Sequence, residues 1–279
     1  MKRIQSLQAH IFNIGLAAVL CGLIYLEVHG LNRIPGEKLY AGIHLKDVVV
    51  GLTIYLKTAV DFAILIGILM KTYQGKAHSR MIIAGTAIGN AGGTIAILAL
   101  WYFFKEVNWL LAIMIILASL VLLKLAETSL EHINRKDRDS GNIPKWVLGA
   151  KHGVEFVLLP INKVLRPVLG RIVPDLKLDT AKKLGLAGLF VMSLKIPFIL
   201  GLDDFAGYVP LFNIVNVFGF AIGVIVGHAI LCSLLFLSPK HTIRAVKNPI
   251  ISLVGSLAFV GLAGWGLIEA IKLLSGHHG

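Results

Sequence analysis

Seven long apolar stretches dominate this sequence and limit the folds that it can adopt. A helix needs roughly 20 mostly apolar residues to cross the ~30 Å hydrocarbon core of a bilayer. The stretches lie at about 7–28, 46–70, 81–104, 107–127, 184–206, 210–237 and 249–274. Apolar residues make up 56% of the chain and charged residues 15%, which excludes an ordinary soluble domain and a disordered chain. The sequence therefore predicts an all-α integral membrane protein with seven transmembrane helices.

The first stretch begins as a signal peptide would, with Lys2 and Arg3 ahead of an apolar run. No small-x-small cleavage site follows that run, so we expect an uncleaved helix. Residues 1–45 would then form an extra N-terminal transmembrane helix and an outer loop. The chain has two cysteines, Cys21 and Cys232, both within apolar runs, which excludes a disulfide framework and a cysteine-rich zinc module.

The basic residues are distributed unevenly between the two sides of the predicted membrane. With a cytoplasmic N-terminus, the inner segments carry 19 Lys and Arg, and the outer segments carry five. Lys and Arg collect in cytoplasmic loops, so we expect the N-terminus inside and the C-terminus outside. An odd number of helices agrees with this orientation. We expect the plasma (inner) membrane of a bacterium.

The segment 128–183 is the only large loop, and it is basic and amphipathic. Its apolar residues alternate with basic ones, which favours helices lying on the inner leaflet against anionic lipid headgroups. We expect Pro160, Pro167 and Pro174 to break it into short pieces. The segment 135–141 is the predicted flexible tip. A docking surface on the protein's own bundle is an equally weighted alternative for the amphipathic part.

Two short motifs occur twice in the same order. Asp61-Phe-Ala recurs as Asp204-Phe-Ala, and Gly-x-Ala-Ile-Gly-x-x-x-Gly begins at both Gly85 and Gly219. One further apolar stretch follows each copy, so the motifs mark two three-helix units, 46–127 and 184–279. Because three is odd, the second unit enters the membrane from the opposite side, which gives an inverted repeat as in many secondary transporters. The alternative is a chance match between common membrane residues. The spaced glycines predict close helix packing.

Five of the charged residues inside the apolar stretches are candidates for a functional site, because charge is costly there. They are Asp61, Asp203, Asp204, Lys57 and Lys195. Three acids against two lysines leave a negative excess, which suits a cation or a proton. The three aspartates are therefore the candidate metal ligands, and all five side chains are candidates for binding substrate or proton. Lys57 could pair with Asp61 one turn away or with the acids of the other unit. Salt bridges that only lock the bundle are the alternative.

The adjacent acids Asp203 and Asp204 lie in a stretch that is rich in helix-weakening residues. These residues are Pro197, Gly201, Gly207 and Pro210. Interrupted transmembrane helices expose carbonyl groups that bind ions, so we expect a break near Asp203 and Asp204. No equal signature surrounds Asp61, and no break is expected there.

Four other polar residues within the apolar runs are a predicted secondary lining of the site. They are Asn90, Asn213, Asn216 and His228. Such residues most often hydrogen-bond a neighbouring helix. A histidine can also carry protons, because imidazole ordinarily titrates near neutrality.

Several kinds of chemistry lack their sequence signals. The chain has no phosphate-binding glycine loop, no His-Glu-x-x-His and no Gly-x-Ser-x-Gly. We therefore expect no enzyme activity and no cofactor. The basic loop lacks the interleaved aromatic residues that suit nucleic acid, so no nucleic-acid partner is expected.

The acid motifs resemble those of a known family. Gly201-Leu-Asp-Asp-Phe-Ala-Gly-Tyr-Val-Pro-Leu-Phe212, followed by a glycine-rich helix, resembles the second-half motif of cadmium-resistance-type transporters of the LysE superfamily. Val60-Asp-Phe-Ala-Ile-Leu-Ile66 is similar to the first-half motif. The resemblance implies an inverted pair of three-helix units, export of small cations or organic solutes, and substrate-facing acids at Asp61, Asp203 and Asp204.

The chain also departs from this family pattern. Asp61 stands alone between Val60 and Phe62, where such families tend to carry a second polar residue. Lys57 and Lys195 lie beside the acids, and the first helix and the basic loop are additions. These departures weaken the expectation of a bound metal ion more than the expectation of the fold.

Together these patterns predict a secondary transporter that exports a divalent cation or small cationic solute, with protons as a candidate coupling ion. The alternative is a non-transporting membrane scaffold or regulator whose basic loop binds anionic lipid or a protein partner. The expected partners are the bilayer, anionic lipid, and a small cation or proton. Assembly into a homo-oligomer is left open.

Overall fold

The computed structural model describes residues 2–73, 75–131, 133, 143–172, 184–213, 215–246 and 248–275. Within these ranges, the side chains of 2–9, 60–61, 164–172, 198–208, 213, 239–240, 243 and 246 lie outside the description. The structure is 87% helix, and the described residues contain no strand. The prediction of an all-helical protein is confirmed.

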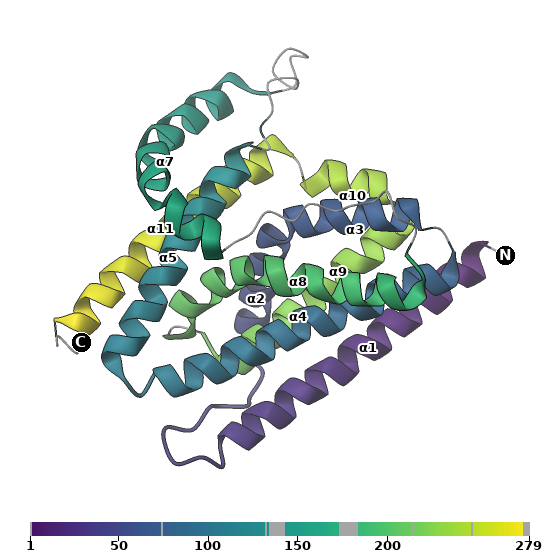
Figure 1. Ribbon diagram of the computed structural model, residues 1–279, viewed down its shortest axis with the longest axis horizontal. Coiled ribbons are helices and arrows are strands. Elements are labelled where there is room, and N and C mark those ends of the chain that lie inside the picture. The colour runs from purple at the N-terminus through teal and green to yellow at the C-terminus, as the bar shows by residue number, and fades with distance from the viewer. Residues whose placement is uncertain are drawn as a thin grey trace.

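The helices are arranged in the order of the chain (Figure 1). They are α1 (Lys2–Leu31), α2 (Leu45–Thr58), α3 (Val60–Thr72), α4 (Lys76–Phe104), α5 (Asn108–Glu131), α7 (Lys145–Ile172), α8 (Leu186–Tyr208), the 3₁₀ helix η1 (Val209–Asn213), α9 (Val217–Leu237), α10 (Pro239–Val246) and α11 (Pro249–Leu274).

Among the described residues, five helices are long and apolar enough to cross a bilayer. They are α1 from His10 onward, α4, α5, α9 and α11. The bent pair α2–α3 satisfies the same test when it is counted as one span, and Leu186–Pro197 of α8 is a shorter apolar helix. These helices identify an integral membrane protein, as predicted.

The single helix predicted over 46–70 is instead two helices. α2 and the segment Phe62–Thr72 of α3 are inclined by 66°. The joint is Ala59, whose ψ of 17° lies outside the helical range. The hydroxyl of Thr58 donates to the carbonyls of Ile54 at 3.2 Å and Tyr55 at 3.1 Å, and such back-bonding commonly bends helices. The expectation of no break beside Asp61 was therefore wrong.

The break predicted near Asp203 and Asp204 is not found at these residues. α8 runs without interruption from Leu186 to Tyr208, with Pro197 inside it, and only then tightens into η1. Neighbouring helices and local adjustments allow proline within membrane helices, which explains why Pro197 does not end this one.

Glycines bring α2 and α9 into close contact. A Cβ atom at Gly223 would lie 2.2 Å from the carbonyl oxygen of Val48, and one at Gly51 would lie 2.1 Å from that of Phe220. Gly227 faces Tyr55, further along both helices in the same direction. The two helices therefore run parallel, with their backbones touching.

The same arrangement joins α4 and α8. A Cβ atom at Gly85 would lie 2.6 Å from the Phe190 oxygen, and one at Gly89 would lie 2.3 Å from the Leu194 oxygen. These helices also run parallel and touch along their backbones. Gly85 and Gly89 of the first copy and all three glycines of the second thus form packing faces, as predicted, whereas a Cβ atom at Gly93 would have no neighbour within 4 Å among the described residues.

The remaining helices surround these two pairs. α5 and α11 pack side by side and run in opposite directions (Figure 1). α1 lies against α9 and α4, and the amide of buried Asn13 donates to the Ala229 carbonyl at 2.7 Å and the Ser233 hydroxyl at 2.9 Å.

α7 is one helix, although Pro160 and Pro167 were predicted to break it. It is visibly curved (Figure 1) and packs against α5 and α11. Its buried residues include Val147 and Leu158, and the amide of Asn162 donates to the Leu123 carbonyl at 3.1 Å. Docking on the bundle, one of the two alternatives, is therefore observed. Pro174 and the predicted tip 135–141 lie outside the described residues.

Candidate functional site

The three predicted aspartates can be placed on the backbone only. Asp61 is the second residue of α3, directly after the joint at Ala59, and Asp203 and Asp204 lie in the C-terminal half of α8. Their side chains are outside the described part of the chain. Their convergence on one site remains a prediction.

Lys57 reaches across to another helix. Its ammonium group donates to the Ile251 carbonyl of α11 at 2.7 Å, and its side chain lies over Gly255. The lysine is half-buried. A backbone carbonyl is thus its described partner, where the sequence suggested a carboxylate. Lys195 is exposed on α8.

His228 is the predicted lining residue with the clearest surroundings. It is 2% exposed in α9, and its Nδ1 lies 2.8 Å from the hydroxyl of Tyr55 in α2. Its Nε2 lies 3.4 Å from Sγ of Cys232, and this sulfur lies 3.9 Å from Oγ1 of Thr86 in α4. A continuous polar chain therefore links three helices in the buried centre of the bundle.

The rest of this chain of four residues is equally enclosed. Tyr55, Cys232 and Thr86 are 1%, 0% and 0% exposed, and the Phe62 ring packs on the imidazole with 5.4 Å between centroids. Phe62 belongs to α3 and follows Asp61 directly. The polar chain thus extends to the joint between α2 and α3, where the first repeated acid lies.

The predicted asparagines have different surroundings. Asn90 is 5% exposed, and its amide nitrogen has no hydrogen-bond partner among the described residues. Asn216 caps α9 by accepting from the Gly219 amide at 2.8 Å, and it donates to the Tyr40 carbonyl at 2.7 Å. Asn216 is therefore an end cap of α9, and its place in the lining of the site stays a prediction. The side chain of Asn213 lies outside the description.

Two further buried carboxyl groups were not singled out from the sequence. Both oxygens of Glu27 in α1 and Oδ2 of Asp47 in α2 are shielded from solvent, and none has a partner among the described residues. Asp47 is 1% exposed and lies in the first turn of α2, beside Gly219 in the first turn of α9. Helix N-termini favour negative charge, which explains this position. Glu27 could have been found from the sequence, because it is a single acid within an apolar run.

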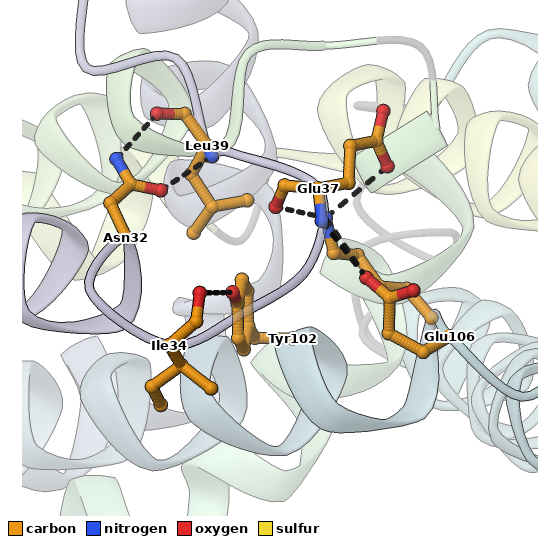
Figure 2. A network of polar contacts seen from close by, with 7 residues as sticks. Asn32, Ile34, Glu37, Leu39, Tyr102 and Glu106 are labelled. Atoms are coloured by element: carbon orange, nitrogen blue, oxygen red, sulfur yellow. Dashed lines mark hydrogen bonds and ion pairs between the residues drawn. The ribbon is translucent and has the colours of Figure 1, made fainter.

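A second polar network closes one end of the bundle (Figure 2). Asn32 and Leu39 exchange two hydrogen bonds across the loop, and the amide of Glu37 donates to Glu106 at 3.3 Å. The hydroxyl of Tyr102 contacts the Ile34 carbonyl at 3.5 Å. The loop after α1 is thereby attached to the C-terminal end of α4.

Lys105 is the most enclosed cation of this network, and Lys38 also contributes by donating to the Asn32 and Ile34 carbonyls. The ammonium group of Lys105 donates to the Glu37 carbonyl at 3.1 Å and pairs with its carboxylate at 3.3 Å. It also lies 5.5 Å from the Trp101 ring centre and 5.1 Å from that of Tyr102. Its side chain is only 8% exposed. Rings and carboxylates together hold the charge in place.

Within the described residues, no group of three or more His, Cys, Asp or Glu side chains is arranged to hold a metal ion. No family model, curated protein or solved structure matches this chain. The site must therefore be interpreted from its own geometry.

Proposed function

We propose that this chain is a secondary membrane transporter that exports a divalent cation or small cationic solute. The observation that carries the proposal is the crossed pairing of parallel helices. α2 pairs with α9 and α4 pairs with α8, and each pair uses one copy of the glycine motif. The first helix of each predicted unit thus packs against the second helix of the other.

This pairing is what two inverted units would produce. The first two helices of a unit run in opposite directions. In an inverted copy both directions are reversed, so the first helix of one unit becomes parallel to the second helix of the other. The antiparallel pair α5–α11 fits the same relation between the third helices. Seven spans result when the bent pair α2–α3 and α8 each cross the membrane.

The joint at Ala59 supports a transport site at Asp61. Interrupted helices at membrane depth occur where the backbone is buried in protein or lines a cavity, and carboxylates beside such a break are suited to cations. In our proposal Asp61, Asp203 and Asp204 bind the cation or a proton in turn. Lys57 and Lys195 act as alternating counter-charges. Membership of the LysE superfamily and a bacterial inner-membrane location belong to the same proposal.

The test is efflux from vesicles over a panel of divalent ions, using the full chain with Asp61→Asn or Asp204→Asn. We expect flux to fall at least about ten-fold in each variant, the equivalent of ~1.4 kcal/mol. Glu131→Gln is the matched control, because Glu131 is exposed at the end of α5. Unchanged flux in both aspartate variants at equal expression would remove the acids from the mechanism.

A second candidate function is a scaffold that binds anionic lipid through α7. The face of α7 turned away from the bundle exposes Trp146 (60%), Phe156 (84%) and Val157 (54%), and Lys145 and Lys163 beside this face are exposed. An apolar face beside basic residues is typical of helices in the membrane interface. This function predicts that charge reversal at Lys145 and Lys163 abolishes activity while Asp61→Asn has no effect.

A further inference from the structure

Glu27 is an acid inside a membrane span that the proposed transport mechanism does not use. It belongs to the apolar span His10–Leu31 of α1. Both of its carboxyl oxygens are shielded from solvent, and neither has a hydrogen-bond partner among the described residues. An ionised carboxyl group is costly in such a place, and acids within membrane helices commonly mark proton pathways. The surroundings of Glu27 therefore decide what this group can bind.

Glu27 lies on the side of α1 that packs against the bundle. It follows Ile24 by three positions and precedes Leu31 by four, and residues at these spacings share one face of a helix. Ile24, its neighbour Val28 and Leu31 are all buried. The carboxyl group is thus enclosed by protein and does not depend on lipid for its shielding.

The contacts of α1 with α9 fix the level at which Glu27 lies. The Tyr25 ring is 5.8 Å from that of Phe218, whereas Asn13, three turns earlier in α1, bonds to Ala229. The two helices therefore run in opposite directions, and Glu27 is level with the first turn of α9. None of the amides in that turn donates to the carboxyl group, so its charged form lacks the hydrogen bonds that would stabilise it.

The helices packed against α1 offer Glu27 no counter-charge among the described residues. α9 contains no Lys or Arg, and its His228 is directed at Tyr55. In α4, Lys76 and Arg80 lie in the first two turns, at the end of the helix opposite to the loop after α1. Beyond α4, Lys105 pairs with Glu37. The remaining titratable groups of α1, α4 and α9 have other partners or are exposed, and they are His10, Tyr25, His29, Arg33, His78, Tyr102 and Cys232.

We propose that Glu27 is a proton-binding site, in which a neutral carboxylic acid is held between α1 and the bundle. The bound proton removes a charge that the surroundings do not compensate. Release breaks the O–H bond, passes the proton to water at this end of the bundle, and leaves a charge that favours separation of α1 from α9. Glu27 lies near the C-terminal end of α1, where the helix dipole also disfavours negative charge. Use of this proton for coupling rests on the proposed transport function, whereas its binding does not.

The test is labelling of the full chain in detergent at neutral pH with dicyclohexylcarbodiimide, an apolar reagent that adds to protonated carboxyl groups. The acid proton moves to a reagent nitrogen and the carboxyl oxygen bonds to the central carbon. The acyl group then migrates to nitrogen, so the whole reagent stays attached. By mass spectrometry we expect label on Glu27 at least about ten-fold above that on the control Glu131, because exposed carboxyl groups are ordinarily ionised at neutral pH. Glu27→Gln should remove the label.

Infrared spectroscopy checks the proton directly. The carbonyl band of a protonated acid, recognised by its shift in D₂O, should be present at neutral pH, absent after Glu27→Gln, and lost reversibly at alkaline pH. An unlabelled Glu27, identical bands in the two proteins, or a band that persists at alkaline pH in folded protein would each overturn the proposal. If Glu27→Gln fails to fold, the labelling and the pH dependence of the band in the unsubstituted chain decide. Neither measurement uses flux, so failure of the transport proposal is a separate result.

Discussion

Lys105 shows how one side chain can attach a loop to a membrane bundle. Its ammonium group contacts two aromatic rings of α4 and the main chain and carboxylate of Glu37. The carboxylate of Glu37 is 81% exposed, so solvent weakens the ion pair itself. The enclosed contacts with the carbonyl and the rings therefore contribute most of the stabilisation.

Replacing Lys105 with methionine should loosen the loop 32–44 without unfolding the protein. Loss of the hydrogen bond and the cation–π contacts should cost about 1 kcal/mol, which raises the open population roughly five-fold. Trypsin cleavage after Arg33 or Lys38 should accelerate by the same factor. Lys46→Met, at a nearby exposed position, is the control. An unchanged cleavage rate would show that Lys105 does not restrain the loop.

Sequence reasoning found charged and polar residues in the membrane more readily than their partners. His228 was singled out because a polar residue in an apolar run is unusual. Its partner Tyr55 lies 173 positions away, and no local pattern connects the two. Lys57 was expected beside an acid, yet a carbonyl of α11 is within its reach. The end-cap role of Asn216 was predictable, because asparagine before an apolar helix is a common N-cap.

At the level of helices, tertiary packing, and not the helix propensity of single residues, determines where a helix continues and where it bends. Three prolines were expected to break α7 and α8, yet Pro160, Pro167 and Pro197 lie inside continuous helices. A sharp bend instead occurs at Ala59, after a threonine that bonds back to its own helix. The glycine spacing was the more reliable signal, since it reports the distance between backbones directly.

Gly223→Ala should destabilise the protein, because the added methyl group would overlap the Val48 carbonyl of α2. Overpacking of this kind costs about 1–3 kcal/mol. Gly22→Ala is the matched control, since a Cβ atom at Gly22 has no described neighbour within 4 Å, and it should be neutral or stabilising by up to ~1 kcal/mol. Thermal unfolding in detergent measures both changes. Equal melting temperatures for the two variants would contradict close packing at Gly223.

For the molecule as a whole, contacts between loops group the ends of the helices. Leu39 and Tyr40 of the first loop meet Asn32 and Asn216, and Glu37 meets Lys105. The backbone amide of Leu184 donates to the Tyr73 hydroxyl at 3.1 Å. The first group contains segments that were assigned to the outer side from their low positive charge, and the second contains segments assigned to the inner side. These contacts agree with the grouping of the loops, and the side on which each group lies stays a prediction.

The orientation can be tested with reporters fused after Gly279. If the C-terminus lies outside, alkaline phosphatase should be active there and a fluorescent protein should stay dark, because basic loops remain in the cytoplasm. The same reporters fused after Lys76 should give the opposite result. Bright fluorescence at the C-terminus would contradict either the orientation or the odd number of spans.

The crossed pairing of α2 with α9 has a consequence for how the protein is made. Gly51 meets Phe220 only after about 170 further residues have been synthesised, which takes roughly 10–30 s at ordinary translation rates. During that interval the glycine grooves of the N-terminal helices must be filled by lipid or by an insertion chaperone. Assembly is therefore completed late. If synthesis stops within the basic loop, α2 and α4 are left without the helices α9 and α8 against which they pack.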